Sequence, residues 1–144
     1  MKRLFLTLSA LFLILCHRAA AVDSVVVFNE VNYHPADGST NGEWIELHNQ
    51  MAIDIDLSAW KLVDGASFEF PEGTIIPGRG HVLIAANPAG LQAATGLTGV
   101  LGPFTGQLAN GGDTLELRDR NHRLMDRLAY GDSSPWPVAA DGSG

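Results

Sequence analysis

The stretch D-T-L-E-L-R-D-R-N-H-R-L-M-D-R-L-A-Y, residues 113–130, determines the fold class of this chain. Its first half alternates, with Leu115 and Leu117 on one side and charged residues on the other. Residues 120–122 then supply a polar turn. Four side chains of the second half share one face: Leu124, Asp126, Leu128 and Tyr130. Because successive side chains of a strand point to opposite faces, this pattern predicts an antiparallel hairpin with one buried face.

Asp126 places a carboxylate among the apolar side chains of that face. A buried charge is costly unless hydrogen bonds satisfy it. We therefore interpret Asp126 as a structural carboxylate that bonds backbone groups in a loop, in preference to a functional acid.

The rest of the chain repeats this rhythm of short apolar runs between turn residues. Five upstream segments are expected to be strands: residues 24–31, 43–49, 60–64, 68–70 and 80–86. The one helical candidate covers residues 89–95, behind Asn87 and Pro88. Seven or eight short strands with almost no helix predict an all-β protein of the sandwich or barrel type.

The N-terminus has the layout of a secretory signal peptide. Two basic residues precede an apolar run at residues 4–16, and small residues follow at 19–21. A membrane-spanning helix needs about 20 apolar residues, which is more than this run contains. We therefore expect residues 1–21 to be removed, with no membrane insertion afterwards and a secreted location, extracellular or periplasmic. A retained anchor and, through Cys16, a lipoprotein are the alternatives.

The charge of the expected mature chain excludes some partners. Residues 22–144 carry six Lys and Arg against sixteen Asp and Glu, a formal net charge of −10. Such a surface repels nucleic-acid phosphates and anionic lipid, so we expect neither as a partner. The only cysteine leaves with the signal peptide, so we expect neither a disulfide nor a cysteine metal site.

We assign no catalytic residue and expect no enzymatic activity. The sequence contains neither the G-x-S-x-G nor the H-E-x-x-H pattern. We interpret the four histidines of the mature chain as surface or half-buried structural residues: His34, His48, His81 and His122. The acidic residues Glu30 and Glu46 are expected on neighbouring strands, where chance proximity explains them.

Acidic loops leave calcium as an alternative cofactor, because calcium takes roughly six to eight oxygen ligands. The candidate ligands are Asp37, Asp54, Asp56 and Asp132. Their loops do not match the EF-hand pattern, and ordinary turn chemistry explains the same residues. We therefore assign no metal ligand and no cofactor.

The tryptophans are the remaining candidates for binding. Trp60 follows L-S-A in an expected strand and is assigned to the core. Trp44 and Trp136 are the candidate binding aromatics. Trp44 faces the same way as Glu46, whereas Trp136 stands between prolines and either packs back over the sandwich edge, the favoured reading, or makes an exposed contact.

Six strings, taken in order, resemble bacterial lamin-tail domains, over about residues 28–144. They are N-E-V-N-Y-H-P (29–35), E-W-I-E-L-H-N (43–49), D-L-S-A-W-K-L-V-D-G (56–65), F-P-E-G-T-I-I-P-G-R-G-H-V-L-I-A (70–85), L-A-N-G-G-D-T-L-E-L-R-D (108–119) and M-D-R-L-A-Y-G-D-S-S-P-W-P (125–137). The resemblance implies an immunoglobulin-like β-sandwich of seven to eight strands at residues 22–144.

Two departures from the family pattern stand out. Ala59 replaces the usual glycine, which a slightly different turn would accommodate. The sequence ends at A-D-G-S-G, where the family continues into a closing strand, so we expect this chain to be a fragment without its last strand.

The resemblance also implies a function in larger exported proteins, sometimes beside hydrolase, nuclease or spore-coat-kinase-like domains. Our first hypothesis is a non-catalytic interaction, adhesion or spacer module whose partners are proteins or polysaccharides of a surface. The second is an accessory targeting domain of an extracellular enzyme with its catalytic domain beyond Gly144. The third is calcium-dependent adhesion.

Overall fold

The computed structural model describes residues 25–36, 38–134 and 136; the expected signal peptide, residues 1–21, lies outside this part of the chain. The described elements, in chain order, are β1 Val26–Asn32, η1 Thr40–Gly42, β2 Trp44–Asn49, β3 Ile55–Asp56, β4 Lys61–Val63, β5 Ala66–Glu69, β6 Ile75–Ile76, β7 His81–Ala85, α1 Pro88–Thr95, β8 Thr105–Gly106, β9 Gly112–Arg118 and β10 Leu124–Gly131.

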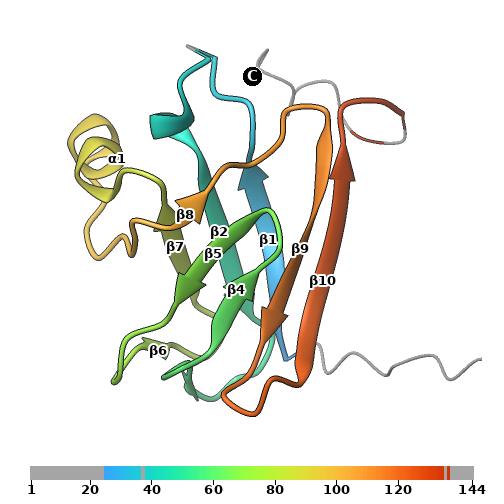
Figure 1. The fold of residues 1–144 in the computed structure, drawn as a ribbon. Helices are drawn as coiled ribbons and strands as arrows, with labels where there is room; N and C mark the ends of the chain where they lie inside the picture. The colour runs from blue at the N-terminus through green and yellow to red at the C-terminus, as the bar shows by residue number, and fades with distance from the viewer. Residues whose placement is uncertain (1–24, 37, 135, 137–144) are drawn as a thin grey trace, which may run out of the picture.

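Two antiparallel sheets form the two layers of a sandwich (Figure 1). The small sheet has the strand order β1-β2-β7, and the large sheet has the order β10-β9-β4-β5-β8. The two-residue strands β3 and β6 pair separately. The all-β prediction is confirmed, and the architecture agrees with an immunoglobulin-like sandwich.

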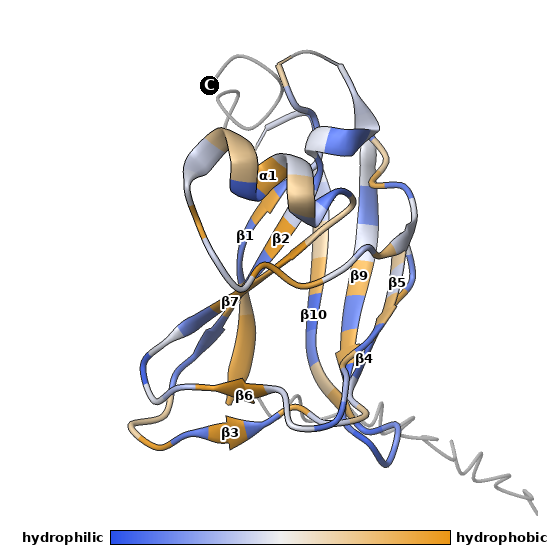
Figure 2. Ribbon diagram, turned by 90° about the vertical axis from the view of Figure 1, so that its left-hand side faces the viewer, coloured by the Kyte–Doolittle hydropathy of each residue, from blue (hydrophilic) through white to orange (hydrophobic). Residues whose placement is uncertain are grey.

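The hairpin of residues 113–130 forms as the alternation predicts. β9 and β10 pair antiparallel, with Leu128 opposite Leu115 and Tyr130 opposite Asp113. Leu115 and Leu117 are fully buried between the layers. Figure 2 shows the matching alternation of hydrophobic and hydrophilic residues along β9. Burial of one face therefore fixes the register of this hairpin.

One part of the hairpin prediction is wrong. The register shifts between Leu124 and Asp126, so that Met125 is an extra residue in β10. This β-bulge pairs Leu124 with Arg118, whereas Asp126 pairs with the buried Leu117. Leu124 therefore leaves the inner face, and Met125 is buried in the core in its place.

The single α-helix of the described chain also follows its sequence signals. The Asn87 side chain accepts a hydrogen bond from the Gly90 N–H at 3.0 Å, and Pro88 occupies the first helical turn. Gly96 ends the helix in the left-handed conformation. The helix lies beside η1 and β7 (Figure 1). Neither α1 nor any other described helix has the length and apolarity that crossing a membrane requires.

Ala59 occupies a backbone conformation that favours glycine. It is the third residue of the turn 57–60, which the hydrogen bond from the Trp60 N–H to the Leu57 carbonyl closes at 2.9 Å. Its φ is +59°. The alanine is thus accommodated in the left-handed conformation itself.

Candidate functional site

The open side of the sandwich lies between β1 and β10. Each is the edge strand of its sheet, and neither has a second ladder partner among the described strands. Figure 1 shows both strands pointing in the same direction. The two edges are joined by side-chain hydrogen bonds in place of a ladder.

Two hydrogen bonds between described residues bridge this seam. The Asp126 carboxylate accepts a hydrogen bond from the Phe28 N–H at 2.8 Å. The Tyr33 hydroxyl donates to the Gly131 carbonyl at 3.2 Å. Both bridges join residues that are 98 positions apart, which agrees with a parallel alignment of the two strands.

Asp126 therefore has the structural role that its position predicts. An unpaired N–H at a sheet edge needs an acceptor, and the Asp126 carboxylate provides one. The accepted N–H belongs to β1, however, and Asp126 itself lies in β10, so a loop is not involved. Asp126 thus bonds a backbone group, as predicted, but it does so between two strands and not in a loop.

A stacked tyrosine pair forms the upper end of the seam. The rings of Tyr33 and Tyr130 have centroids 4.7 Å apart and an interplanar angle of 28°. The Tyr130 hydroxyl is buried and has no hydrogen-bond partner of normal geometry among the described residues. Burial, and then the Asp113 and Glu43 carboxylates, raise the pKa of Tyr130 well above its usual range, against a weak opposing contact with the Ala109 backbone.

A groove of about 340 Å³ opens between the two bridges. We call it the seam groove, and its lining residues are Phe28, Asn29, Glu30, Val31, Tyr33, Leu128, Tyr130 and Trp136. Most of its lining is apolar, with an amide and a carboxylate on the β1 side.

The apolar lining belongs to the inner faces of the two sheets. Phe28 and Val31 pair with Leu47 and Ile45 of β2, which are fully buried. Phe28 and Val31 face the same way as their partners, yet both remain half-buried. Leu128 is likewise half-buried opposite the fully buried Leu115. The core is thus left uncovered along this seam, because the small sheet ends at β1.

The rim of the seam groove is acidic. Glu30 lies directly opposite Glu46 on β2, and like charges in this position repel each other. Glu46 has two polar neighbours: the Asn29 amide donates to it at 2.6 Å, and the His81 Nε2 lies 3.9 Å away. Glu30 is exposed and forms no hydrogen bond or ion pair with any described residue. From the sequence we attributed the proximity of Glu30 and Glu46 to chance. In the structure the two residues are direct cross-strand partners.

Sequence reasoning missed Glu43, which is 2% exposed. Its carboxylate accepts a hydrogen bond from the Leu108 N–H at 3.0 Å, which links the start of β2 to the loop before β9. Burial raises the pKa of Glu43, and the Leu108 hydrogen bond opposes this rise. No motif marks this residue; its place directly before the alternating strand 44–49 is the only signal.

The structure separates the two candidate binding aromatics. Trp136 packs back against the core and lines the seam groove, beside Gly131. Trp44 is half-buried on β2, between Asn32 and Ala85, and does not line the seam groove.

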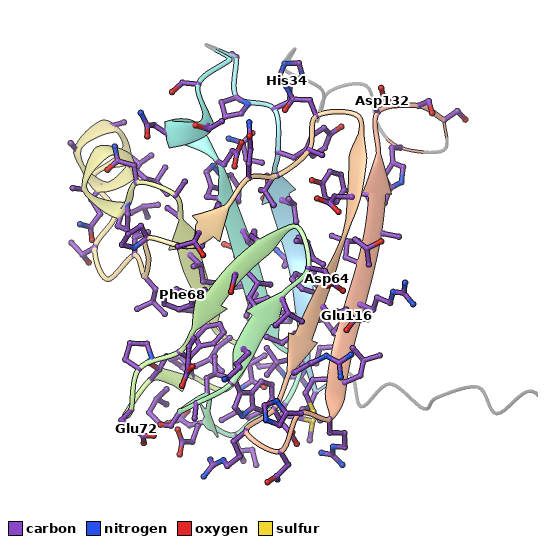
Figure 3. All side chains as sticks on the ribbon, viewed as in Figure 1. His34, Asp64, Phe68, Glu72, Glu116 and Asp132 are labelled. Carbon is purple, nitrogen blue, oxygen red and sulfur yellow. The ribbon has the colours of Figure 1, made fainter. Side chains whose placement is uncertain are left out.

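The candidate calcium ligands are also not brought together. Asp54 accepts the Gly78 N–H at 2.9 Å, and Asp56 is bonded to Ser58 and Arg120. Asp56 lies in β3 at one end of the sandwich (Figure 2), and Asp132 follows β10 at the other end (Figure 3). Asp37 lies outside the described residues.

Within residues 25–36, 38–134 and 136, no group of three or more His, Cys, Asp or Glu side chains could hold a metal ion. His48 and His81 do lie together, with stacked rings whose centroids are 4.5 Å apart on β2 and β7. Stacked rings turn their faces, and not their nitrogen atoms, toward each other.

Comparison with known proteins agrees with this architecture. The family model of the Lamin Tail Domain matches residues 19–132, which is most of the chain. A search of curated proteins finds no match.

Proposed function

Because the chain belongs to the lamin tail domain family, a family of non-catalytic immunoglobulin-like modules, we propose that it is a non-catalytic interaction module of an exported, larger protein. The observation that carries this proposal is the seam groove. Its inner-face side chains Phe28, Val31 and Leu128 stay only half-buried, although their cross-strand neighbours are fully buried. Apolar surface that remains accessible in a concave site is typical of a binding surface.

Export is supported by residues 1–21, whose basic start, apolar run and small residues are typical of a signal peptide. N-terminal sequencing of the protein after expression with its leader tests this part. We expect a new terminus at Val22 and recovery outside the cytoplasm. A protein that keeps Met1, or that carries an acyl group on Cys16, would contradict it.

The partner is proposed to be a protein or polysaccharide of a surface, and the seam groove is its binding site. We would measure retention of the purified protein on arrays of polysaccharides and of peptides, for the wild type, Leu128→Asn and Glu72→Gln. Glu72 is exposed and lies far from the seam groove (Figure 3), so Glu72→Gln is the matched control. Retention that is lost only in Leu128→Asn supports the proposal.

Two outcomes of this experiment would contradict the proposal. Equal retention of all three proteins would exclude the seam groove as the site. If the wild type were retained on neither array, we would reject the role of interaction module and favour that of a spacer. In the accessory-domain hypothesis the seam groove is again the binding site, and its binding would bring an enzyme in another domain of the protein to the bound surface.

A further inference from the structure

We infer that the seam groove binds an extended, basic and apolar segment of another polypeptide, which adds to the free edge of β1 as a fourth strand of the small sheet. This inference rests on the proposed function and specifies its partner. Three separate observations support the inference: the backbone edge of β1, the apolar lining of the seam groove and the charge of its rim.

The backbone edge of β1 has no second ladder partner among the described strands, although the Asp126 and Tyr33 bridges cross this edge. An edge strand presents unpaired N–H and C=O groups, and peptides use such edges for β-augmentation. Across the seam the Phe28 N–H donates to the Asp126 carboxylate, and the Tyr33 hydroxyl, just after β1, donates to the Gly131 carbonyl, so an added strand would displace these two bridges. An added strand would lie about 4.8 Å from β1 and continue the small sheet across the inner face of β10.

The apolar lining sets which side chains such a strand would turn inward. The small sheet has three strands opposite the five of the large sheet. Phe28, Val31 and Leu128 are the inner-face side chains that this difference leaves half-buried. A fourth strand would complete the cover of these side chains if its inward residues are apolar. Its outward residues would then alternate with them, because the side-chain period of a strand is two.

The acidic rim of the seam groove determines which outward side chains an added strand should carry. Glu30 has no compensating charge and faces Glu46 across the β1–β2 ladder. The residues that line the seam groove include one carboxylate and no Lys or Arg. An outward Lys or Arg on an added strand would lie beside Glu30 and relieve the repulsion from Glu46.

The same charges argue against two other occupants. Residues 137–144, P-V-A-A-D-G-S-G, contain an acid and no basic residue. A second copy of the chain would bring the same acidic excess, sixteen Asp and Glu against at most nine Lys and Arg. A segment of another, basic polypeptide is therefore the best fit.

The probe that tests this inference is a peptide of about eight residues that alternates valine and lysine, a length typical of a strand. Binding to the purified protein is measured by titration of tryptophan fluorescence and by isothermal calorimetry. The control peptides have the same composition in two blocks, or glutamate in place of lysine. A further pair carries N-methyl groups on alternate residues, along one edge or the other, which removes the ladder donors of that edge.

We expect the alternating peptide to bind and both control peptides to bind at least tenfold more weakly. Methylation along one edge should abolish binding, whereas methylation along the other edge should not. Glu30→Lys should lower the affinity by about tenfold and Glu72→Lys, the matched charge reversal, by less than about twofold. These results would establish an added strand with a basic outer face.

Other results would overturn the inference. Equal binding of the block and alternating peptides would exclude a strand, and equal binding of both methylated peptides would exclude a ladder. A large gain in affinity on removal of residues 137–144 would make these residues the occupant. A dimer that the peptide dissociates would make a second copy the occupant. Absence of any peptide binding, together with groove-dependent polysaccharide retention, would reject this inference and leave the proposed function standing.

Discussion

Ala59 shows how a single residue can hold an unfavourable backbone conformation. At φ +59° an L-residue with a Cβ costs roughly 1 kcal/mol more than glycine. Because the greater freedom of glycine in the unfolded chain offsets part of this cost, Ala59→Gly should raise the free energy of unfolding by roughly 0.5 kcal/mol, measured by urea denaturation. Ala52→Gly, at an exposed turn residue without a positive φ, is the control and should slightly lower stability. A stability of Ala59→Gly equal to or below that of the wild type would show that the turn carries no such strain.

Glu43 predicts a pH dependence with a definite sign. Burial raises its pKa in the folded protein above the ordinary value of 4.5. The folded state therefore holds the proton more tightly than the unfolded chain, and stability falls as pH rises from about 4.5 through the folded pKa. Glu43→Gln keeps an acceptor for the Leu108 N–H and removes the charge.

The difference in stability between Glu43→Gln and the wild type should accordingly grow in favour of the variant between pH 4.5 and pH 7. Thermal denaturation across this range is the measurement. Glu72→Gln, at an exposed acid, should show no such trend. A constant difference across the range would mean that the Glu43 pKa is not raised by folding.

These residues also mark how far sequence reasoning reaches at this scale. Asp126 could be interpreted as structural because its strand pattern placed it on an apolar face. Glu43 could not, because its burial depends on the approach of Leu108, 65 residues away. Contacts of that separation follow from the packing of two layers and leave no periodic signal in either segment.

The β9–β10 hairpin is held at its turn by one carboxylate. Asp119 accepts hydrogen bonds from the Asn121 N–H at 2.8 Å and the Arg123 N–H at 2.9 Å. Burial opposes ionisation of Asp119, but the Arg123 and Asn121 hydrogen bonds and the Arg123 charge together lower its pKa. The stability that this carboxylate contributes is present above its unfolded pKa of about 3.8 and is lost as pH falls through the lower folded pKa.

Asp119→Asn should lower the free energy of unfolding at pH 7 by about 1 kcal/mol, because its amide oxygen is a weaker acceptor than the carboxylate. The loss should shrink below pH 3.8, as the wild-type carboxylate takes up its proton. Urea denaturation at several pH values is the measurement, with Glu72→Gln at an exposed turn residue as the control. The same loss at every pH would assign the effect to the side-chain shape and not to its charge.

Elements were predictable where their signal is local. The hairpin and the helix behind Asn87 and Pro88 follow from alternation, turn residues and an N-terminal cap. The strands β3, β6 and β8 have two residues each and exist only through their partners, so that no pattern could indicate them. The bulge at Met125 was missed for a related reason, since it depends on the register that the core imposes.

At the scale of the whole molecule, the alternation along single strands cannot reveal the seam. β1 and β10 come from opposite ends of the domain, and they are joined by single side chains and not by a ladder. The sandwich and its core were therefore predictable, whereas the seam groove was not. The sequence indicated Trp136 as a candidate binding residue, but it did not indicate the other residues that line the seam groove.

The two bridges predict that the seam opens as one unit. Asp126→Ala and Tyr33→Phe should each lower the free energy of unfolding by about 1 kcal/mol. The bridges start from Phe28 in β1 and from Tyr33 just after it, five residues and about 16 Å apart, a separation at which independent substitutions are usually additive. If β1 and β10 separate together, the first substitution already weakens the second bridge, and the double variant should lose clearly less than the sum of the single losses.

Urea denaturation of the single and double variants measures this coupling, and hydrogen exchange locates it. In each single variant the amides of β1 and β10 should exchange faster along the full length of the seam, while those at the centre of β9 stay protected. Glu72→Ala combined with Asp126→Ala is the control pair and should be additive, because Glu72 is far from the seam (Figure 3). Additive losses in the Asp126 and Tyr33 pair, with faster exchange only beside each substituted residue, would mean that the two bridges act separately and that the seam has no common opening.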